Sequence, residues 1–320
     1  MQNTVYNAFH KFNFIFRKEN TMKKALKVIA LILALSMVAC GFASCGSTDT
    51  DTTDGANATD NAVVETKDVI KVVDIALTEE QYGIAVSKDQ DDLLEKLNAF
   101  IKESKENGVF DEITNKYFGD GTPEGITSAE LDTSKDQLVV ATNAEFAPFE
   151  YKDGDKFMGI EMEFMAKFAE SLGKELVIKD GAFDAVLNEV DSGNADIAAA
   201  ALTITEERLK QVNFTDAFYT ASQKVITLAD DTKFADCTTK EDVEAVLNSF
   251  DSDVKIGFQN GTTGEFYTKG SDDYAGYKVT AAGYDSAALA VQDMINGNID
   301  YVITDEAPAN ALAEKFNAAN

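Results

Sequence analysis

The chain has 320 residues, of which 45% are hydrophobic, and a formal net charge of −28. This length and apolar content predict a globular protein with room for two compact domains, and they exclude a largely disordered chain. The strong negative charge argues against nucleic-acid binding, because contacts with phosphates need a basic surface.

Residues 1–44 are interpreted as a targeting segment. Three lysines follow Met22, and an apolar run over residues 28–39 comes next. A membrane-spanning helix needs about 20 apolar residues, so this run is too short to span a bilayer but suits a signal peptide. We expect Met22 to be the true start of the protein.

Two cysteines follow this apolar run, Cys40 and Cys45. A small residue before a cysteine at this place resembles a bacterial lipoprotein signal, which implies cleavage before the cysteine and acylation of its sulfur. Cys45 is favoured because a polar, flexible tether over residues 45–61 begins there. Cys40 is the alternative, and a plain secreted protein without lipid stays open. The expected location is extracytoplasmic, with a lipid anchor to the membrane.

The few histidines and cysteines limit the chemistry of the mature chain. The single histidine, His10, precedes Met22, and Cys237 is the one cysteine beyond Cys45. These residues allow no zinc cluster and no nucleophile activated by histidine. We therefore expect no metal and no cofactor.

Strand and helix signals alternate from residue 68 onward. Ile160, Phe164 and Phe168 recur at helical spacing and predict one buried helix face. A glycine-rich stretch over residues 119–136 is typical of a linker or long loop. Predicted strands cover residues 70–76, 82–86, 138–141, 176–178, 196–200, 225–226, 254–258 and 299–304. This alternation favours α/β architecture, in which ligands bind at the carboxyl ends of strands.

Four ordered motifs resemble the amino-acid-binding proteins of ABC importers, bacterial solute-binding protein family 3. They are LVVATNAEFAPFEY at 138–151, LTITEERLKQVNFTD at 202–216, GFQNGTTG at 257–264 and ITDEAP at 303–308. The resemblance implies a two-lobe periplasmic-binding-protein type II (Venus flytrap) fold. It also implies extracytoplasmic binding of a free amino acid, delivery to the membrane subunits of an importer, and no enzymatic activity.

The order of the motifs departs from the family. Residues 77–86 and 108–119 resemble the family's C-terminal end, yet here they precede its beginning. We interpret this as a circular permutation, which compact domains with adjacent termini tolerate. A mis-assembled gene, or an exchange of residues 68–118 between two chains, stays open.

The permuted order predicts two lobes joined by two crossings, in a protein expected to be a monomer. The first lobe is 83–217 with the linker at 119–136, the second combines 62–77 with 223–320, and the hinges are 78–82 and 218–222. We expect the ligand to contact both lobes only when the cleft is shut, so that it favours closure.

Arg208 is the first candidate site residue, because every other basic residue after Cys45 is a lysine. A planar guanidinium can hold a carboxylate through two parallel hydrogen bonds, which a lysine cannot. The family resemblance assigns this position to the α-carboxylate of the ligand. A structural salt bridge to an acid such as Asp216 is the alternative.

The resemblance adds further polar contacts. Thr203, Thr262 and Thr263 are placed to donate to the ligand carboxylate, and Asp305 to accept from the ligand ammonium. Each of these residues could instead be an ordinary helix cap. Ala201, in the same motif as Thr203, is included among the ligand-binding positions.

Two aromatic and three polar positions complete the predicted site. The resemblance implies that Phe146 and Phe183 flank the ligand side chain, although aromatic residues are more often core. Asn143, Glu145 and Gln259 are the expected specificity positions. Asn143 stands where the family often has aspartate, which weakens the case for a cationic ligand, and an inward-pointing Glu145 could restore it.

An enzymatic alternative shares this fold. Cyclohexadienyl dehydratases use a carboxylic acid for acid–base chemistry. In this chain an acid such as Glu145 would have to lie over a leaving hydroxyl. Turnover of prephenate or arogenate distinguishes that activity from simple binding.

Overall fold

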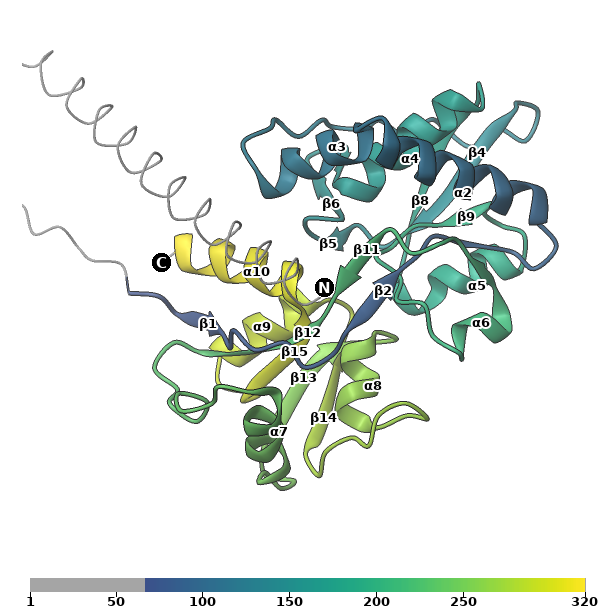
Figure 1. The fold of residues 1–320 in the computed structure, drawn as a ribbon. Helices are drawn as coiled ribbons and strands as arrows, with labels where there is room; N and C mark the ends of the chain where they lie inside the picture. The colour runs from purple at the N-terminus through teal and green to yellow at the C-terminus, as the bar shows by residue number, and fades with distance from the viewer. Residues whose placement is uncertain (1–66, 320) are drawn as a thin grey trace, which may run out of the picture. The chain divides into compact units, whose positions relative to one another are not determined.

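The computed structural model describes residues 67–319, and its elements are organised around two five-stranded sheets (Figure 1). The predicted signal segment, the tether, and the candidate lipidated residues Cys40 and Cys45 lie outside the described residues. No helix within residues 67–319 is long and apolar enough to cross a bilayer. The fold is mixed α/β, as the alternating strand and helix signals predict.

The first sheet has the strand order β10-β3-β9-β4-β8. Its strands are β3 (Ala85–Val86), β4 (Gln137–Thr142), β8 (Glu175–Asp180), β9 (Ile197–Ala198) and β10 (Asn213–Phe214). β4 is parallel to β8 and β9, whereas β3 is antiparallel to β9 and β10. The predicted strands at 138–141 and 176–178 fall inside β4 and β8, so the short apolar runs identified them correctly.

Helices pack on both faces of the first sheet (Figure 1). They are α2 (Asp91–Glu106), α3 (Val109–Phe118), α4 (Ile160–Ser171), η1 (Phe183–Ala185), α5 (Val186–Asp191) and α6 (Arg208–Gln211). Leu97 of α2, Phe110 of α3 and Phe164 of α4 share one core with Leu138 and Val140 of β4. A separate apolar cluster joins α5 to β4 and β9. We call this whole assembly the first-sheet region.

The second sheet has the strand order β1-β12-β15-β13-β14. Its strands are β1 (Ile70–Val72), β12 (Gln223–Leu228), β13 (Lys255–Gln259), β14 (Thr280–Tyr284) and β15 (Tyr301–Asp305). β13 is parallel to β14 and β15, and β12 is antiparallel to β1 and β15. β13 and β15 therefore end at the same edge of the sheet, where parallel α/β proteins bind ligands.

Four helices cover the second sheet and complete the second-sheet region. They are α7 (Lys240–Asn248), α8 (Thr263–Lys269), α9 (Ala287–Ile295) and α10 (Glu306–Ala318). One core joins Val243 and Leu247 of α7 to Ile256 of β13 and Ile303 of β15, and a second core lies under α9 and α10. Thr239 begins α7 with a reciprocal capping box to Asp242.

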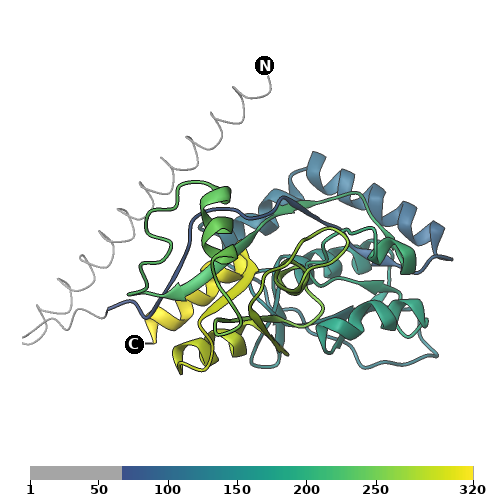
Figure 2. The same cartoon turned by 90° about the horizontal axis from the view of Figure 1, so that it is seen from below.

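The end of α10 lies beside the start of β1, as both views show (Figures 1 and 2). The Asn317 side-chain oxygen accepts hydrogen bonds from the backbone N–H groups of Val69, at 2.9 Å, and Ile70, at 3.1 Å. The Asn317 amide in turn donates to the carbonyl of Ile70 at 3.0 Å. Two segments from opposite ends of the sequence are thereby joined at one edge of the second sheet.

Two strands link the two regions. β2 (Glu80–Tyr82) pairs antiparallel with β11 (Tyr219–Ala221), with Tyr82 opposite Tyr219 and Glu80 opposite Ala221. They lie within the predicted crossings at 78–82 and 218–222. That these crossings act as hinges stays a prediction.

A small antiparallel sheet and the glycine-rich segment complete the first-sheet region. The sheet contains β5 (Glu145–Phe146), β6 (Glu150–Asp153) and β7 (Lys156–Met158). Residues 119–136 form no helix or extended strand, as expected for a loop. They are nevertheless fastened to the region, because Ile126 exchanges backbone hydrogen bonds with Phe157, at 2.8 and 2.9 Å.

Candidate functional site

Arg208 connects the two regions through its guanidinium. The side chain is buried at the start of α6, where Nη1 donates to the carbonyl of Thr203 at 2.8 Å and Nη2 to the carbonyl of Gly261 at 2.9 Å. Its Cζ atom lies 5.5 Å from the centre of the half-buried Phe183 ring. These carbonyl contacts, rather than a salt bridge to Asp216, hold the guanidinium between the regions.

Two charges near Arg208 compensate for its burial. Burial lowers the pKa of the Arg208 guanidinium, and the negative charges of Glu80 and Asp305 oppose that shift. The arginine therefore lies in the electrostatic field of both carboxylates. One of the two, Glu80, was not among the predicted site residues.

Glu80 bridges two of the three threonines that were predicted to bind the ligand carboxylate. One oxygen of its buried carboxylate accepts hydrogen bonds from the hydroxyls of Thr203, at 2.7 Å, and Thr263, at 2.8 Å, and the other accepts from Thr78 at 2.6 Å. Thr203 belongs to the first-sheet region, and Thr263 opens α8 of the second. The structure thus brings Thr203 and Thr263 together around a protein carboxylate.

The neighbouring Thr262 has a different position. Its hydroxyl oxygen caps α8 by accepting from the backbone N–H of Glu265 at 3.4 Å, and its hydroxyl donates to the carbonyl of Gln259 at 2.8 Å. Both bonds are local. Of the two adjacent threonines, the side chain of Thr263 alone reaches Glu80.

Asp305 ends β15 and is buried. It stands at the N-cap position of α10 but makes no side-chain capping bond there, and it accepts instead from the hydroxyl of Tyr82 at 2.5 Å. Burial, followed by the negative charge of Glu80, raises the pKa of Asp305 to about 7, while the Tyr82 hydrogen bond partly offsets the increase. Burial and the neighbouring charge of Glu80 thus both disfavour the ionised form of Asp305.

Asn143 and Gln259 meet across the two regions. Nε2 of Gln259, at the end of β13, donates to Oδ1 of Asn143, directly after β4, at 2.7 Å. Asn143 also donates to the carbonyl of Gly181 at 2.8 Å, and Gln259 to that of Asp285 at 3.0 Å. Two predicted specificity residues thus share one buried contact between strand ends.

The remaining predicted residues differ in burial and in what they contact. Phe146 is buried in the first-sheet core beside Phe149, with 6.5 Å between the ring centres. Ala201 is buried with a positive φ of 48°, and its N–H donates to Glu161 at 3.0 Å. Glu145 is exposed, so the structure does not bring its side chain to the buried group.

Comparison with known proteins identifies the family of this chain. The family model for bacterial extracellular solute-binding proteins, family 3, matches residues 138–271. An ancestral arginine-binding protein, solved bound to arginine, is 32% identical and is covered over 75% of its length by 57% of this chain, with a TM-score of 0.48. The chain belongs to family 3 of the bacterial extracellular solute-binding proteins.

Curated relatives of this family-3 protein are named for the amino acids that they bind. The arginine-binding extracellular protein ArtP of Bacillus subtilis (strain 168) is 32% identical over 106 residues, which are 33% of this chain and 42% of ArtP. A probable histidine-binding protein of Neisseria gonorrhoeae is 27% identical over 172 residues, 52% of this chain and 58% of that protein. The chain thus spans about half the length of these two relatives.

Sequence reasoning missed Glu80 and Tyr82 of this family-3 protein. A Thr-Glu-Glu-Gln run is typical of a solvated surface, and the sequence places this run in a crossing and in a segment that resembles the family's C-terminal end, without a site role for its side chains. The one available signal was strand alternation, since Glu80 and Tyr82 are buried on either side of exposed Gln81.

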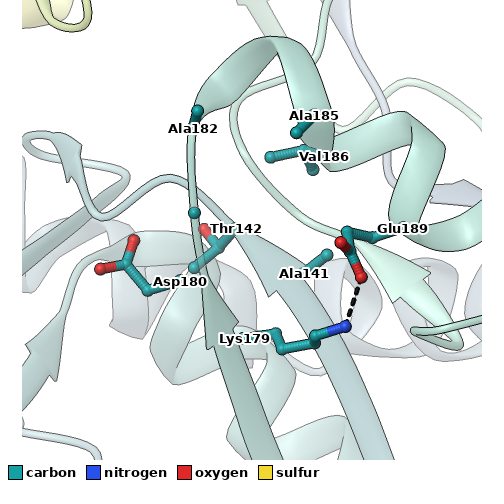
Figure 3. Close-up of a pocket in the computed structure, with 9 residues that line it drawn as sticks. Ala141, Thr142, Lys179, Asp180, Ala182, Ala185, Val186 and Glu189 are labelled. Carbon is teal, nitrogen blue, oxygen red and sulfur yellow. Dashed lines mark hydrogen bonds and ion pairs between the residues drawn. The ribbon is translucent and has the colours of Figure 1, made fainter.

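A small cavity lies beside the site rather than in it (Figure 3). It is lined by the ends of β4 and β8 together with η1 and α5, including Thr142, Asp180 and Val186. Lys179 and Glu189 form an ion pair at its edge. None of the predicted site residues lines this cavity, although Asn143 follows Thr142 directly.

Proposed function

We propose that this family-3 protein binds a free amino acid outside the cytoplasm and delivers it to an ABC importer. The observation that carries the proposal is the buried network of Arg208, Thr203, Glu80, Thr263 and Asp305, which spans both regions. Arg208 retains N–H donors for a ligand carboxylate, and Asp305 can accept from a ligand ammonium. The relatives that bind arginine and histidine support an amino acid as the ligand.

Ligand-driven closure is the proposed mechanism. The first lobe, residues 83–217, carries Arg208 and Thr203, and the second lobe, residues 62–77 with 223–320, carries Thr263 and Asp305. An amino acid in contact with both sets stabilises the shut form, because only that form makes all the contacts. The shut form is what the importer's membrane subunits would recognise. Residues 78–82 and 218–222 would absorb the rotation.

A calorimetric screen tests the proposal. The purified chain is titrated with each of the twenty amino acids, cystine and ornithine, and we expect at least one to bind with 1:1 stoichiometry. Because hydrogen bonds to charged groups contribute about 1.5–3 kcal/mol, D305N should weaken that binding by about tenfold or more. T239A, which removes a distant helix cap, is the control. Absence of binding by all ligands would contradict the proposal.

We also propose that the protein is not an enzyme. The acid suggested for dehydratase chemistry, Glu145, is exposed, whereas the residues of the network are buried. Incubation with prephenate or arogenate should therefore yield no product. Turnover that E145Q abolishes would establish the alternative instead.

Circular permutation remains part of the proposal. Support comes from the bonds of Asn317 to Val69 and Ile70, which fasten the end of α10 to the start of β1. A rearranged gene that encodes residues 137–318 followed by 68–118 should yield a soluble protein with the same ligand. Sizing of the natural chain should give a monomer, whereas a dimer would favour exchange of residues 68–118 between two chains.

A lipid anchor on Cys45, with Cys40 as the alternative, is proposed from the sequence alone. Mass spectrometry of protein extracted from membranes should show acylation of one of these two cysteines. Protein released in soluble form with neither cysteine modified would contradict the anchor.

A further inference from the structure

The buried charges within residues 67–319 are not balanced. Seven charged side chains are buried there: Glu80, Glu150, Glu161, Glu163, Arg208, Lys224 and Asp305. Glu163 pairs with Lys116 at 2.6 Å, and Lys224 pairs with Asp74 at 3.2 Å. Of the other five, four are carboxylates and one is a guanidinium.

These four carboxylates influence one another across the two regions. The charge of Glu80 raises the pKa of Asp305, after the larger effect of burial. Burial raises the pKa of Glu150 well above its usual value, and the charges of Glu161 and Asp305 raise it further. The pKa of the Tyr82 hydroxyl is raised as well, first by burial and then by the charges of Asp305, Glu80 and Glu150. Their contacts agree: Glu80 accepts from Thr203 and Glu161 from nearby Ala201, Asp305 accepts from Tyr82, and the ring of Phe149, directly before Glu150, lies 5.2 Å from the ring of Tyr82. We call these four acids the acidic cluster.

Glu150 has the least support of the four. It begins β6 and is completely buried, and neither of its carboxylate oxygens has a hydrogen-bond partner among the described residues. Glu161, its neighbour in the cluster, uses one oxygen to accept from Ala201 and leaves the other without a partner. A buried carboxylate in this condition is strongly disfavoured in its charged form.

Glu163 is a buried glutamate whose charge is fully compensated by neighbouring hydrogen-bond donors, as expected of a structural residue. Its two oxygens accept from the ammonium of Lys116 at 2.6 Å, the hydroxyl of Tyr117 at 2.7 Å and the backbone N–H of Glu124 at 2.8 Å. Glu150 is equally buried but has no such partners. The contrast indicates that Glu150 serves something other than packing.

We propose that the amino acid bound by this protein has a positively charged side chain, and that Glu150, with Glu161 and Glu80, supplies the counter-charge. The inference rests on the proposed amino-acid binding. In any zwitterionic amino acid, the carboxylate can pair with Arg208 and the ammonium with Asp305, but together these two groups add no net charge. A cationic side chain adds the positive charge that the other three carboxylates need, whereas a neutral side chain does not. Exposed Glu145 is not required for this preference.

The test compares arginine with citrulline, its neutral near-isostere. Calorimetric titration of the wild-type protein at a pH of about 8, where carboxyl groups of ordinary pKa are ionised, should give binding of arginine about tenfold or more tighter than citrulline. In E150Q that ratio should fall toward one, chiefly through weaker arginine binding. E163Q is the matched control, because it also neutralises a buried glutamate of this region and should leave the ratio unchanged.

Each outcome separates this inference from the proposed function. If no amino acid binds, amino-acid binding itself fails. If an amino acid binds but neutral ones bind the wild type as tightly as arginine and lysine do, the charge preference is wrong while amino-acid binding stands. An unchanged ratio in folded E150Q overturns the role of Glu150.

If E150Q fails to fold, the number of protons that the wild-type protein releases on ligand binding tests the role of the acidic cluster instead. A cation that enters the acidic cluster should displace protons, because the pKa of Glu161 is raised to about 8 and that of Asp305 to about 7, in both cases mainly by burial. Titration with arginine near pH 7 in two buffers of different ionisation enthalpy should therefore reveal release, and less release with citrulline. Equal release with both ligands overturns the role of the cluster.

Discussion

Replacement of Asp305 by asparagine should stabilise the ligand-free protein and at the same time weaken ligand binding. The carboxyl group is buried, and its pKa is raised from 3.8 to about 7, first by burial and then by the charge of Glu80. Because one pKa unit corresponds to about 1.4 kcal/mol, the ionised form is disfavoured in the folded protein by about 4 kcal/mol relative to the unfolded chain. The amide is never ionised, so D305N removes this penalty.

The sign of this effect depends on pH. The folded state holds the Asp305 proton more tightly than the unfolded state does, so the contribution of Asp305 to stability falls as pH rises from about 4 to about 7. The charged or titratable groups that act on Asp305 or feel its charge are Glu80, Tyr82, Glu150, Arg208 and Tyr274. D305N should therefore match the wild type near pH 4 and exceed its stability by up to about 4 kcal/mol near pH 8.

Urea unfolding of ligand-free wild type and D305N at these two pH values measures the difference. Calorimetry on the same samples should show ligand binding weakened by about tenfold or more in D305N, because a charge-assisted bond to the ammonium is lost. A gain in stability with a loss of binding is the signature of a strained functional residue. If D305N is less stable than the wild type near pH 8, the ionised carboxylate is supported by its surroundings and the reasoning fails.

Three further substitutions test separate parts of the account. Gly159 has a φ of 125°, and an added Cβ would lie 2.0 Å from the carbonyl oxygen of Phe149. G159A should therefore lose about 3 kcal/mol or more of unfolding free energy, and an unchanged midpoint of urea unfolding would refute this. N143A removes the acceptor of the Gln259 bond between the regions and should weaken ligand affinity several-fold, by about 1 kcal/mol, in a calorimetric titration; unchanged affinity would show that the contact is dispensable. T239A should lose about 1 kcal/mol of stability through its capping box while affinity stays constant, and a change in affinity would mean that α7 is coupled to the site.

Regular elements with strong apolar periodicity were predictable from the sequence. Ile160, Phe164 and Phe168 are buried on α4 as their spacing predicts, although residues 161–163 and 165 are buried as well, so the burial of this helix is not confined to one face. The predicted strand at 70–76 was expected in the same lobe as residues 223–320. β1 lies there, beside β12 and under α10, although it covers only Ile70–Val72.

The polar part of the site was predictable only where a family motif covered it. Arg208 and Asp305 lie in such motifs, and both are buried between the two regions as that resemblance implies. Glu80 and Glu150 also lie in segments that resemble the family, at 77–86 and 138–151, and both are buried, but nothing in a single sequence distinguishes a buried glutamate from a solvated one. Their burial results from elements far apart in the chain, as the bond from Thr263 to Glu80 illustrates. Glu145 shows the converse, because a motif residue close to Phe146 turns out to be exposed.

Calorimetric titration of R208K with the amino acid that the wild-type protein binds tests the central claim most directly. Lysine keeps the positive charge but cannot make the forked contacts of the guanidinium to Thr203, Gly261 and a ligand carboxylate. We predict a correctly folded variant whose affinity is lower by about tenfold to a hundredfold. Wild-type affinity in R208K would contradict the assignment of this arginine to the carboxylate of the ligand.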